Sequence, residues 1–515
     1  MKKTLLLVLI LCHSLALFAQ ENNSIPRKQT QKGFLTIDYA SVKMPTDKFA
    51  DPENNMGLAG VHYNLWLNKS IYGGLGFYGS IHGKRGGLFT LGANLGIKKK
   101  LFEQLFLDTG FHIGGGGGAS APDGGGAFIM PHANLGYQFK TFTAFAGYSA
   151  INFFDKGNIN SQQLNIGLQI PVSFDHTSFA SKEKTHAFNT LKTTDWNQTS
   201  NRISLLFHLN NLSVIGNSQN IGGSTLVGNT IRLAGFELNA HINNNWFAFF
   251  RADGAYHGIP AGYMDILLGG GYHFSFNNNS THIISKFGVG AGGGGGVDTQ
   301  GGFLISPDIS LEQKIHKGLH ISINKGYLLT PNSHFIASTY GIGLKYYAHT
   351  NGILSKENTV FTKVKLKGIQ ITIQQEMYFN AKRESNPTEN LQQISLQGNL
   401  FLNRYMYVAG QTSFANFGNA GAYAEGIVGL GINSNPIFHK KITAFAQLLG
   451  GAAGGGDIST GQGLIIKPSI GFNYELNDKL SIRTSVGKAT AKGGKLNSTS
   501  VAFGLSYNIS FLTAN

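Results

Sequence analysis

Four ionisable residues in the middle of the chain are the first candidates for chemistry. They are Glu237, Arg251, Asp253 and Asp265, and alternation along the chain places all four on the polar face of their segments. Carboxylates beside an arginine could form an active site or a path for protons or ions. Charges removed from water must also pair with one another, even where they have no functional role. We interpret the four residues as a structural network of ion pairs, with an ion path or an active site as the alternatives.

Catalysis has few other candidates in this sequence. Nucleophilic catalysis needs a nucleophile, a base and an orienting acid gathered at one place. His82 and His257 occupy equivalent positions in two copies of the repeat described below, but the third copy has Phe417 there. No group of cysteines and histidines has the spacing of a metal site. We therefore predict that the chain is not an enzyme, with no catalytic, cofactor-binding or metal-binding residues and no cofactor.

Three glycine runs invite comparison with phosphate-binding loops. They span residues 114–118, 292–296 and 454–456. Phosphate-binding loops join a strand to a helix and continue with Gly-Lys-Ser/Thr, and neither feature accompanies these runs. Glycine instead allows a sheet to bend sharply or a neighbouring backbone to approach closely. We predict close packing, between modules of this chain or with a partner, at Gly114, Gly116, Gly118, Gly292, Gly294, Gly296, Gly454 and Gly456.

The glycine runs belong to an internal repeat. They recur at intervals of roughly 160 to 180 residues, and such a period defines the folding unit. A proline follows each run inside an apolar stretch, and a segment that begins with asparagine (NLWLNK, NAHINN or NLFLNR) precedes each run. The chain is therefore a triplication, with a unit of about 145 residues. The repeat markers are Pro131, Pro307 and Pro468, and Asn64, Asn239 and Asn399.

The beginning of the chain predicts export. Lys2 and Lys3 precede an apolar run at 5–11, and small residues follow, so residues 1–19 have the pattern of a secretory signal peptide. The apolar run is too short for a membrane-spanning helix. The only cysteine, Cys12, lies inside this segment. The exported chain is thus predicted to fold without disulfides.

A two-residue period dominates the rest of the chain. In LFTLGANLGIK, Leu91, Leu95 and Ile97 lie on one face, with glycine, asparagine and lysine on the other. This is the pattern of a β-strand with one apolar and one polar face, and no long stretch keeps a helical period. With 11% aromatic and only 13% charged residues, the composition excludes a disordered glycine-rich chain. In the first copy the pattern predicts strands at 33–44, 56–67, 71–82, 88–98, 105–113, 126–139, 142–153 and 162–174.

The connections between these strands are alternately short and long. Short turns at one rim and long loops at the other are the layout of an outer-membrane barrel. Each copy also ends in a similar segment: IGLQIPVSF, IGLKYYAH or FGLSYNISF. In these features the chain resembles the small eight-stranded outer-membrane β-barrels of Gram-negative bacteria, the OmpA-like and OmpX-like group. The resemblance implies an all-β fold of transmembrane antiparallel up-and-down β-barrels and a location in the bacterial outer membrane.

Two architectures fit twenty-four such strands: three tandem eight-stranded barrels, or one 24-stranded barrel. Polar stretches at 175–200 and 350–367 separate the copies and are unlike the other turns on that rim. Three similar closing segments also indicate three closures, and an eight-stranded barrel is just filled by its side chains. We predict three tandem barrels, with repeats at 33–174, 201–349 and 368–515, and keep the single wide barrel as the alternative.

Charge and fold class together indicate the partners of the chain. Its net charge is +15, but the basic residues lie at turns, in linkers and in the loop 491–495 rather than beside aromatic platforms, so we exclude nucleic acid. Basic loops would be attracted to anionic lipopolysaccharide. The resemblance implies outer-membrane lipid and the barrel-assembly machinery as partners. We predict a structural or surface-interaction role carried by the outer loops, with a transport pore through a wide barrel and a lipid-acting enzyme as alternatives.

Overall fold

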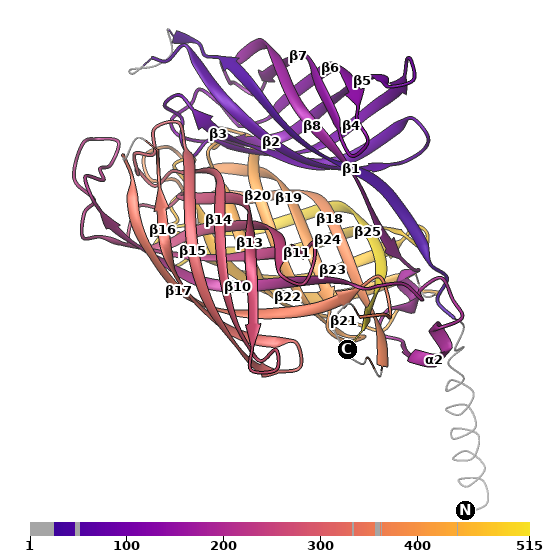
Figure 1. The fold of residues 1–515 in the computed structure, drawn as a ribbon. Helices are drawn as coiled ribbons and strands as arrows, with labels where there is room; N and C mark the ends of the chain where they lie inside the picture. Colours follow the sequence, from indigo (N-terminus) through magenta and orange to yellow (C-terminus); the bar gives the residue numbers. More distant parts are fainter. Residues whose placement is uncertain are drawn as a thin grey trace, which may run out of the picture.

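The structure is a computed structural model, and it describes residues 25–46, 52–331, 334–355, 361, 363–439 and 441–514. The predicted signal peptide at 1–19 lies outside these residues. Antiparallel strands form most of the described chain and gather into groups that follow one another along the sequence (Figure 1). The all-β antiparallel barrel class predicted from the two-residue period is confirmed. Within the described ranges, no helix is long and apolar enough to cross a membrane.

The first group of strands, which we call unit 1, is a closed barrel. Its first strand pairs with the second on one side and with the eighth on the other, from Gln29 opposite His176 to Ala40 opposite Asn165. The strands match the predicted segments to within a few residues, except that β5 continues through most of the glycine run. They are β1 (Gln29–Lys43), β2 (Asn55–Trp66), β3 (Ile71–His82), β4 (Phe89–Lys100), β5 (Leu105–Gly117), β6 (Phe128–Gln138), β7 (Thr143–Phe153) and β8 (Asn160–His176).

Unit 2 contains the next eight long strands. Its first strand pairs with its second and also with its eighth, over a ladder from Asn201 opposite Thr350 to Ile215 opposite Ile336. The run of strands thus returns to its own beginning. The strands are β10 (Asn201–Ile215), β11 (Thr230–His241), β12 (Trp246–His257), β13 (Met264–Phe276), β14 (Thr281–Gly293), β15 (Phe303–His316), β16 (Leu319–Leu329) and β17 (Ile336–Thr350).

Unit 3 repeats this pairing. Its first strand pairs with its second and its last, and the second of these ladders runs from Val364 opposite Ala514 to Tyr378 opposite Ser500. The strands are β18 (Lys363–Ala381), β19 (Glu389–Phe401), β20 (Met406–Phe417), β21 (Ala424–Asn433), β22 (Ile442–Gly454), β23 (Leu464–Glu475), β24 (Leu480–Ala491) and β25 (Asn497–Ala514).

Units 2 and 3 share a sheet through short contacts at one rim. His349 and Thr350 at the end of β17 pair with Ala514 and Thr513 at the end of β25. The stretch predicted as a linker at 175–200 also contributes a strand, β9 (Thr185–Ala187), which pairs with the beginning of β18. The pairing between units thus covers two or three residues, whereas the ladders that return each unit to its first strand run for more than ten.

The linker between units 1 and 2 is folded rather than extended. Besides β9 it contains the turn of 3₁₀-helix η2 (Phe179–Ser181) and the short helix α2 (Phe188–Leu191). The buried Trp196 donates a hydrogen bond from Nε1 to the carbonyl oxygen of Pro26, at 2.8 Å. Leu191, Trp196 and Ile353 belong to one apolar cluster with the ends of β18 and β25. Both linkers therefore pack together beneath the short-turn rim.

The repeat-marker prolines occupy the same strand in every unit, the sixth. Pro131 lies in β6, Pro307 in β15 and Pro468 in β23. At each proline the ladder to the following strand stops for two residues and then resumes in register; Ile305 pairs with Leu329, and the next pair is Asp308 with Gly326. Proline has no N–H to donate, so the gap is what its chemistry requires.

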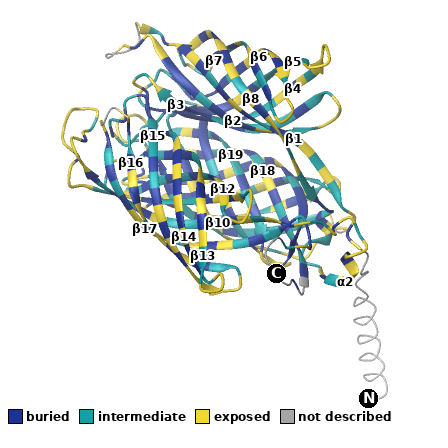
Figure 2. Ribbon diagram, viewed as in Figure 1, coloured by how far each residue is buried: buried dark blue, intermediate teal, exposed yellow. Residues whose placement is uncertain are grey.

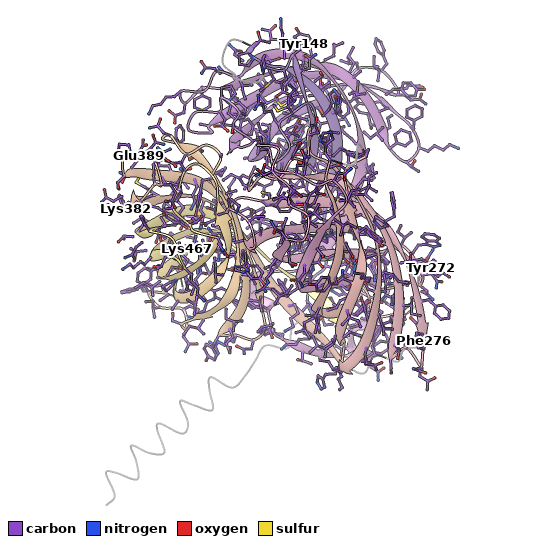
Figure 3. The ribbon with its side chains drawn as sticks, turned by 90° about the vertical axis from the view of Figure 1, so that its left-hand side faces the viewer. Tyr148, Tyr272, Phe276, Lys382, Glu389 and Lys467 are labelled. Atoms are coloured by element: carbon purple, nitrogen blue, oxygen red, sulfur yellow. The ribbon has the colours of Figure 1, made fainter. Side chains whose placement is uncertain are left out.

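The three units pack against one another through their walls, as the view from the side shows (Figure 3). The contacts follow a cycle: the fifth strand of each unit lies on the third strand of another. β5 lies on β20, β14 on β3, and β22 on β12. Where the three units meet, one apolar cluster takes Phe89 from unit 1, Ile266 from unit 2 and Phe414 from unit 3. The strands that carry the glycine runs therefore form the seams between units.

Candidate functional site

The interior of each unit is polar and its outer wall is apolar. Buried and exposed residues alternate along the strands (Figure 2), as expected when successive side chains point to opposite faces. The four ionisable residues predicted to form a network all point into unit 2, and all are buried. The structure brings them together from three neighbouring strands, β11, β12 and β13.

Arg251 and Asp253 form one part of this network. The Nε of Arg251 lies 3.1 Å from Oδ2 of Asp253, and the other carboxylate oxygen of Asp253 accepts a hydrogen bond from Nε2 of His208. Asp265 lies opposite Asp253 in the ladder. Neither carboxylate oxygen of Asp265 has a hydrogen-bond partner among the described residues. Arg251 thus holds one acid directly, with a second acid beside it.

Glu237 pairs with a lysine that we did not single out. It lies opposite Arg251 in the ladder, but its Oε2 accepts a hydrogen bond from Nζ of Lys286 at 2.8 Å. The same Nζ is 3.4 Å from Oδ1 of Asp308, on the next strand. Alternation in the segment IISKFGVG puts Lys286 on the polar face, so the sequence carried the signal for this residue. The sequence did not indicate which acidic residue Lys286 would pair with.

The other two units fill their interiors in the same manner with different residues. In unit 3, Nζ of Lys467 lies 2.9 Å from Glu376 and 3.0 Å from Glu425, and Figure 3 shows this lysine within the unit. In unit 1, the hydroxyl of Tyr78 donates to Asp38 at 2.8 Å, and that of Tyr72 donates to Asp108 at the same distance. Each interior therefore carries its own charges, with ion pairs or hydrogen bonds to groups of the same unit.

The repeat-marker asparagines form an equivalent contact in every interior. All three are buried, and all lie on the second strand of their unit. Each donates from its side-chain Nδ2 to a polar side chain on the first strand, so the asparagine ties together the two strands beside the closing ladder. The pairs are Asn64 with Thr36 at 3.4 Å, Asn239 with Ser204 at 3.2 Å, and Asn399 with Gln370 at 2.9 Å.

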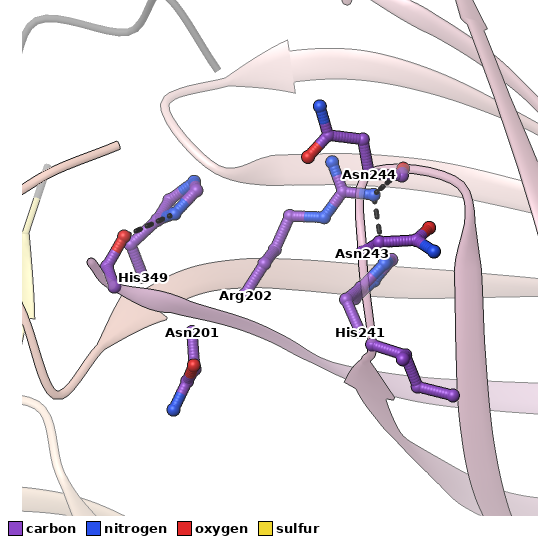
Figure 4. A pocket seen from close by; sticks show the side chains of 8 residues that line it. Asn201, Arg202, His241, Asn243, Asn244 and His349 are labelled. Carbon is purple, nitrogen blue, oxygen red and sulfur yellow. Dashed lines mark hydrogen bonds between the residues drawn. The ribbon is translucent and has the colours of Figure 1, made fainter. Parts of the chain in front are cut away.

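A cluster of histidines and an arginine fills the short-turn end of unit 2 (Figure 4). The Nη2 of Arg202 lies 2.9 Å from Nδ1 of His241 and 3.0 Å from Nδ1 of His273, and donates to the carbonyl of Asn244 at 3.1 Å. At the beginnings of β14 and β16, Nε2 of His282 and Nε2 of His320 are 3.1 Å apart. In the described chain no group of three or more His, Cys, Asp or Glu side chains is placed to hold a metal ion.

The glycine runs lie in the seams, where alternation divides them between two neighbours. A Cβ on Gly115 would stand 2.5 Å from the carbonyl oxygen of Ala415 in unit 3, and one on Gly293 would stand 2.5 Å from the backbone of Gly86 in unit 1. A Cβ on Gly454 would stand 2.6 Å from that of Ala261 in unit 2. These distances are shorter than carbon and oxygen atoms tolerate, so each seam requires a residue without a side chain.

The predicted close-packing positions need a correction at residue level. Of the eight glycines named from the sequence, only Gly454 would direct a Cβ at another unit, although the backbone of Gly294 also lies against Gly87 of unit 1. Gly296 faces open space, so close packing there is wrong. Because side chains alternate, the neighbouring glycines of the same runs, such as Gly115 and Gly293, make the contacts between units. The remaining named glycines pack against strands or loops of their own unit: Gly114, Gly116, Gly118, Gly292, Gly294 and Gly456.

The two equivalent histidines do not assemble a catalytic group. His82 ends β3 and His257 ends β12. Among the described residues, neither has a hydrogen bond or ion pair with a serine or a carboxylate. The absence of catalytic residues stays a prediction.

Comparisons with known proteins give no family. No protein-family model matches the sequence, and no curated protein matches it. Solved structures that align with it include several from Pseudomonas aeruginosa. The ferric enterobactin receptor PfeA in complex with BCV-L6 is 9% identical, with 93% of this chain and 81% of that chain covered and a TM-score of 0.28. OccK11 (OpdR) is 9% identical, with 93% and 96% covered and a TM-score of 0.22. OpdQ is 7% identical, with 94% and 98% covered and a TM-score of 0.21. At TM-scores this low the likeness does not extend to the overall arrangement of strands and carries no argument about function.

The close contact between units 1 and 3 predicts that a side chain at position 115 destabilises the protein. We expect Gly115→Ala to lower the free energy of unfolding by roughly 1–3 kcal/mol, because the new methyl group overlaps the backbone of Ala415. Gly410→Ala is the matched control: it lies on β20, the strand that Gly115 contacts, and a Cβ there meets nothing within 4 Å. Thermal unfolding of both variants in detergent measures the difference. Equal midpoints for the two variants would contradict the contact.

Removal of Lys286 from the interior of unit 2 is expected to lower the free energy of unfolding. Lys286→Met should destabilise the protein by roughly 3–5 kcal/mol, because the buried Glu237 then loses the one cation that donates a hydrogen bond to it among the described residues. Adding Glu237→Leu should restore much of the loss. Lys325→Met, at an exposed lysine of the same unit, is the control. The stability of all three variants is measured by denaturant unfolding, followed by the heat-dependent shift of the protein band in gels. If Lys286→Met is as stable as the parent, water must reach this interior.

The burial of Asp123 beside the seam between units 1 and 3 predicts that the stability of the protein depends on pH. Asp123 lies in the loop after β5, beside Gly124, whose carbonyl accepts a hydrogen bond from the Gly421 N–H of unit 3 at 3.1 Å. Burial raises the pKa of Asp123 from 3.8 to about 7, against the opposing effect of the Gly118 N–H donated to it. Between these values the folded chain keeps a proton that the unfolded chain has lost, so stability falls as pH rises from about 4 to about 7. Asp123→Asn should remove this part of the dependence, and identical pH profiles of unfolding for variant and parent would contradict it.

Proposed function

We propose that the chain is an integral outer-membrane protein made of three tandem eight-stranded barrels, with a structural or surface-interaction role carried by its outer loops. The observation that carries the proposal is the inversion of polarity across each wall. Charged and amide side chains are buried inside each unit, while large apolar side chains stand exposed on the outside. A soluble protein avoids exposed apolar surface on this scale, and a lipid bilayer requires it.

The outer walls have the pattern of a membrane-facing surface. Exposed aliphatic side chains follow one another at two-residue spacing, as in Leu164, Ile166 and Leu168 on β8 of unit 1. Aromatic side chains are exposed near the ends of strands, as at Tyr137 on β6 and Trp246 on β12. Tyr148 and Tyr272 are also exposed and point away from the walls in Figure 3. Apolar bands bordered by aromatic residues match the acyl region and the two interfaces of a bilayer.

Separate closure is supported by the ladders. The first strands of units 2 and 3 pair with the last strands of the same units over most of their length. A single wide barrel would need those edges to pair between units instead. Three closed interiors, each filled by its own ion pairs, leave little room for a continuous water column. The ladders therefore favour three barrels over the transport-pore alternative.

The long loops, opposite the short turns, form a surface that crosses the unit boundaries. The N–H of Gly418 in unit 3 donates to Oδ2 of Asp155 in unit 1 at 2.8 Å, and Nζ of Lys156 donates to Asn419 at 3.1 Å. Between units 1 and 2, the N–H of Gly86 donates to the carbonyl of Gln300 at 2.7 Å. We propose that these bonds make the loops of the three units one recognition surface outside the cell.

The partners follow from this placement. An outer-membrane barrel lies in lipid and lipopolysaccharide, and its net positive charge favours the anionic outer leaflet. Insertion would need the barrel-assembly machinery. A lipid-acting enzyme is the less favoured alternative, since its proposal would need a serine, a histidine and an acid together at one rim.

Ion conduction tests the proposal. We expect the purified protein in planar lipid bilayers to give no stable unitary current steps, because the interior of each unit is occupied by side chains such as Lys286 and Lys467. A general porin recorded in the same bilayers is the positive control, and protection of the strands from added protease confirms insertion. Large, stable steps from inserted protein would overturn three closed barrels and favour the pore.

A further inference from the structure

The short-turn ends of the three units are closed to different degrees. In unit 3, Phe179 of the linker is buried against Phe401 with ring centroids 5.4 Å apart, and Nζ of Lys182 lies 4.0 Å from the centroid of Phe179. In unit 2, Arg202 reaches across the opening to His241 and His273. These two ends are therefore occupied by the chain itself.

The same end of unit 1 is open. It holds a cavity of about 550 Å³, within the size range of sites for small organic molecules. Aromatic side chains of Phe34, Trp66 and Phe106 line it, together with the lysines Lys69, Lys98 and Lys100. Phe34 and Trp66 are in contact with each other, with ring centroids 5.2 Å apart. The cavity thus combines an apolar wall with a positively charged rim.

Lys98 brings a positive charge between the aromatic walls of this cavity. Its Nζ lies 5.0 Å from the centroid of Phe106 and 5.5 Å from that of Phe34, so the ammonium stands between two aromatic rings. It donates to Oε1 of Gln169 at 2.6 Å. An ammonium group has three donors, and this is its single hydrogen bond within the described residues. No carboxylate there forms an ion pair with Lys98.

The nearest acid is already engaged by other groups. Asp108 lies directly opposite Lys98 in the ladder between β4 and β5, but its Oδ1 accepts from the hydroxyl of Tyr72 at 2.8 Å and its Oδ2 accepts from Nε2 of Gln169 at 2.7 Å. His132 approaches Oδ1 at 3.7 Å. Gln169 therefore bridges acid and lysine and holds them apart. Asp108 attracts Lys98 across the ladder without a direct hydrogen bond among the described residues, so the ammonium keeps donors for a group that enters the cavity.

We infer that this cavity binds a small organic anion that carries an aromatic or alkyl part. The anionic group would lie against Nζ of Lys98, with Lys69 and Lys100 adding long-range attraction at the rim. The apolar part would lie against Trp66 and Phe34, whose rings gain from removal of their surface from water. In the orientation proposed above the cavity opens to the periplasm. The inference does not depend on that orientation, because it rests on the cavity and its residues.

Titration calorimetry of the full-length protein in non-ionic detergent, with naphthalene-2-sulfonate as the probe, tests this inference. We expect saturable binding of one probe per chain. Lys98→Met should weaken it at least tenfold, because the counter-charge is lost, and Trp66→Leu should weaken it through loss of the aromatic wall. Lys140→Met is the matched control: Lys140 is exposed on the same rim but does not line the cavity, and its removal should leave the affinity unchanged.

Two further probes separate the contributions. The neutral naphthalene-2-methanol and inorganic phosphate should each bind much more weakly than the sulfonate. Should Lys98→Met fail to fold, the double variant Lys69→Met/Lys100→Met changes only exposed residues and should weaken binding severalfold with a smaller salt dependence. The inference is overturned if the sulfonate shows no saturable binding, if the cavity variants that fold bind it like the parent, or if either simpler probe binds as tightly.

Discussion

The pairing of the first strand of each unit with its last strand is the interaction on which the rest of the structure depends. It leaves no long free edge in any unit, and in a bilayer an unpaired edge would expose backbone donors and acceptors to hydrocarbon. Closure after eight strands also sets the width of the interior, since strand number and barrel radius are linked. A narrow interior has room for side chains but little for water. The charges inside must therefore find partners within their own unit, as Lys286 and Lys467 do.

Apart from the short rim pairing and the loop hydrogen bonds, the units associate through their outer walls, and this explains the glycine runs. A wall that faces lipid is best covered by large apolar side chains, but a wall that faces another barrel needs a close approach of backbones. Each fifth strand loses its side chains where it meets the third strand of another unit, and the three contacts form a cycle. A cycle leaves no unit at an open end. The linkers then need only join the units, and they are free to take other roles beneath the rim.

The sequence predicted what depends on local period and failed where a choice between distant partners decides. Alternation located the strands of unit 1 and put Glu237, Arg251, Asp253 and Asp265 on one polar face, because side-chain direction follows from position in a strand. Alternation did not predict that Glu237 pairs with Lys286, because this pairing depends on barrel shear and on side-chain rotamers. Alternation also did not predict which glycines of a run face the neighbouring unit. The folded linker, with β9 and Phe179, carried no periodic signal because its partners lie in unit 3.

Repetition of one scaffold also explains where the units have diverged. The walls repeat closely: the sixth-strand prolines interrupt the same ladder, and the second-strand asparagines bond the same neighbour. The ends of the interiors do not repeat. A phenylalanine from the linker covers one, an arginine crosses the second, and aromatic rings with Lys98 line the third. Wall residues are held by closure and by lipid or a neighbouring unit, so a change there risks the fold. Residues at an open end carry neither constraint, and if the three barrels are closed as proposed, these residues and the outer loops are where specificity can arise.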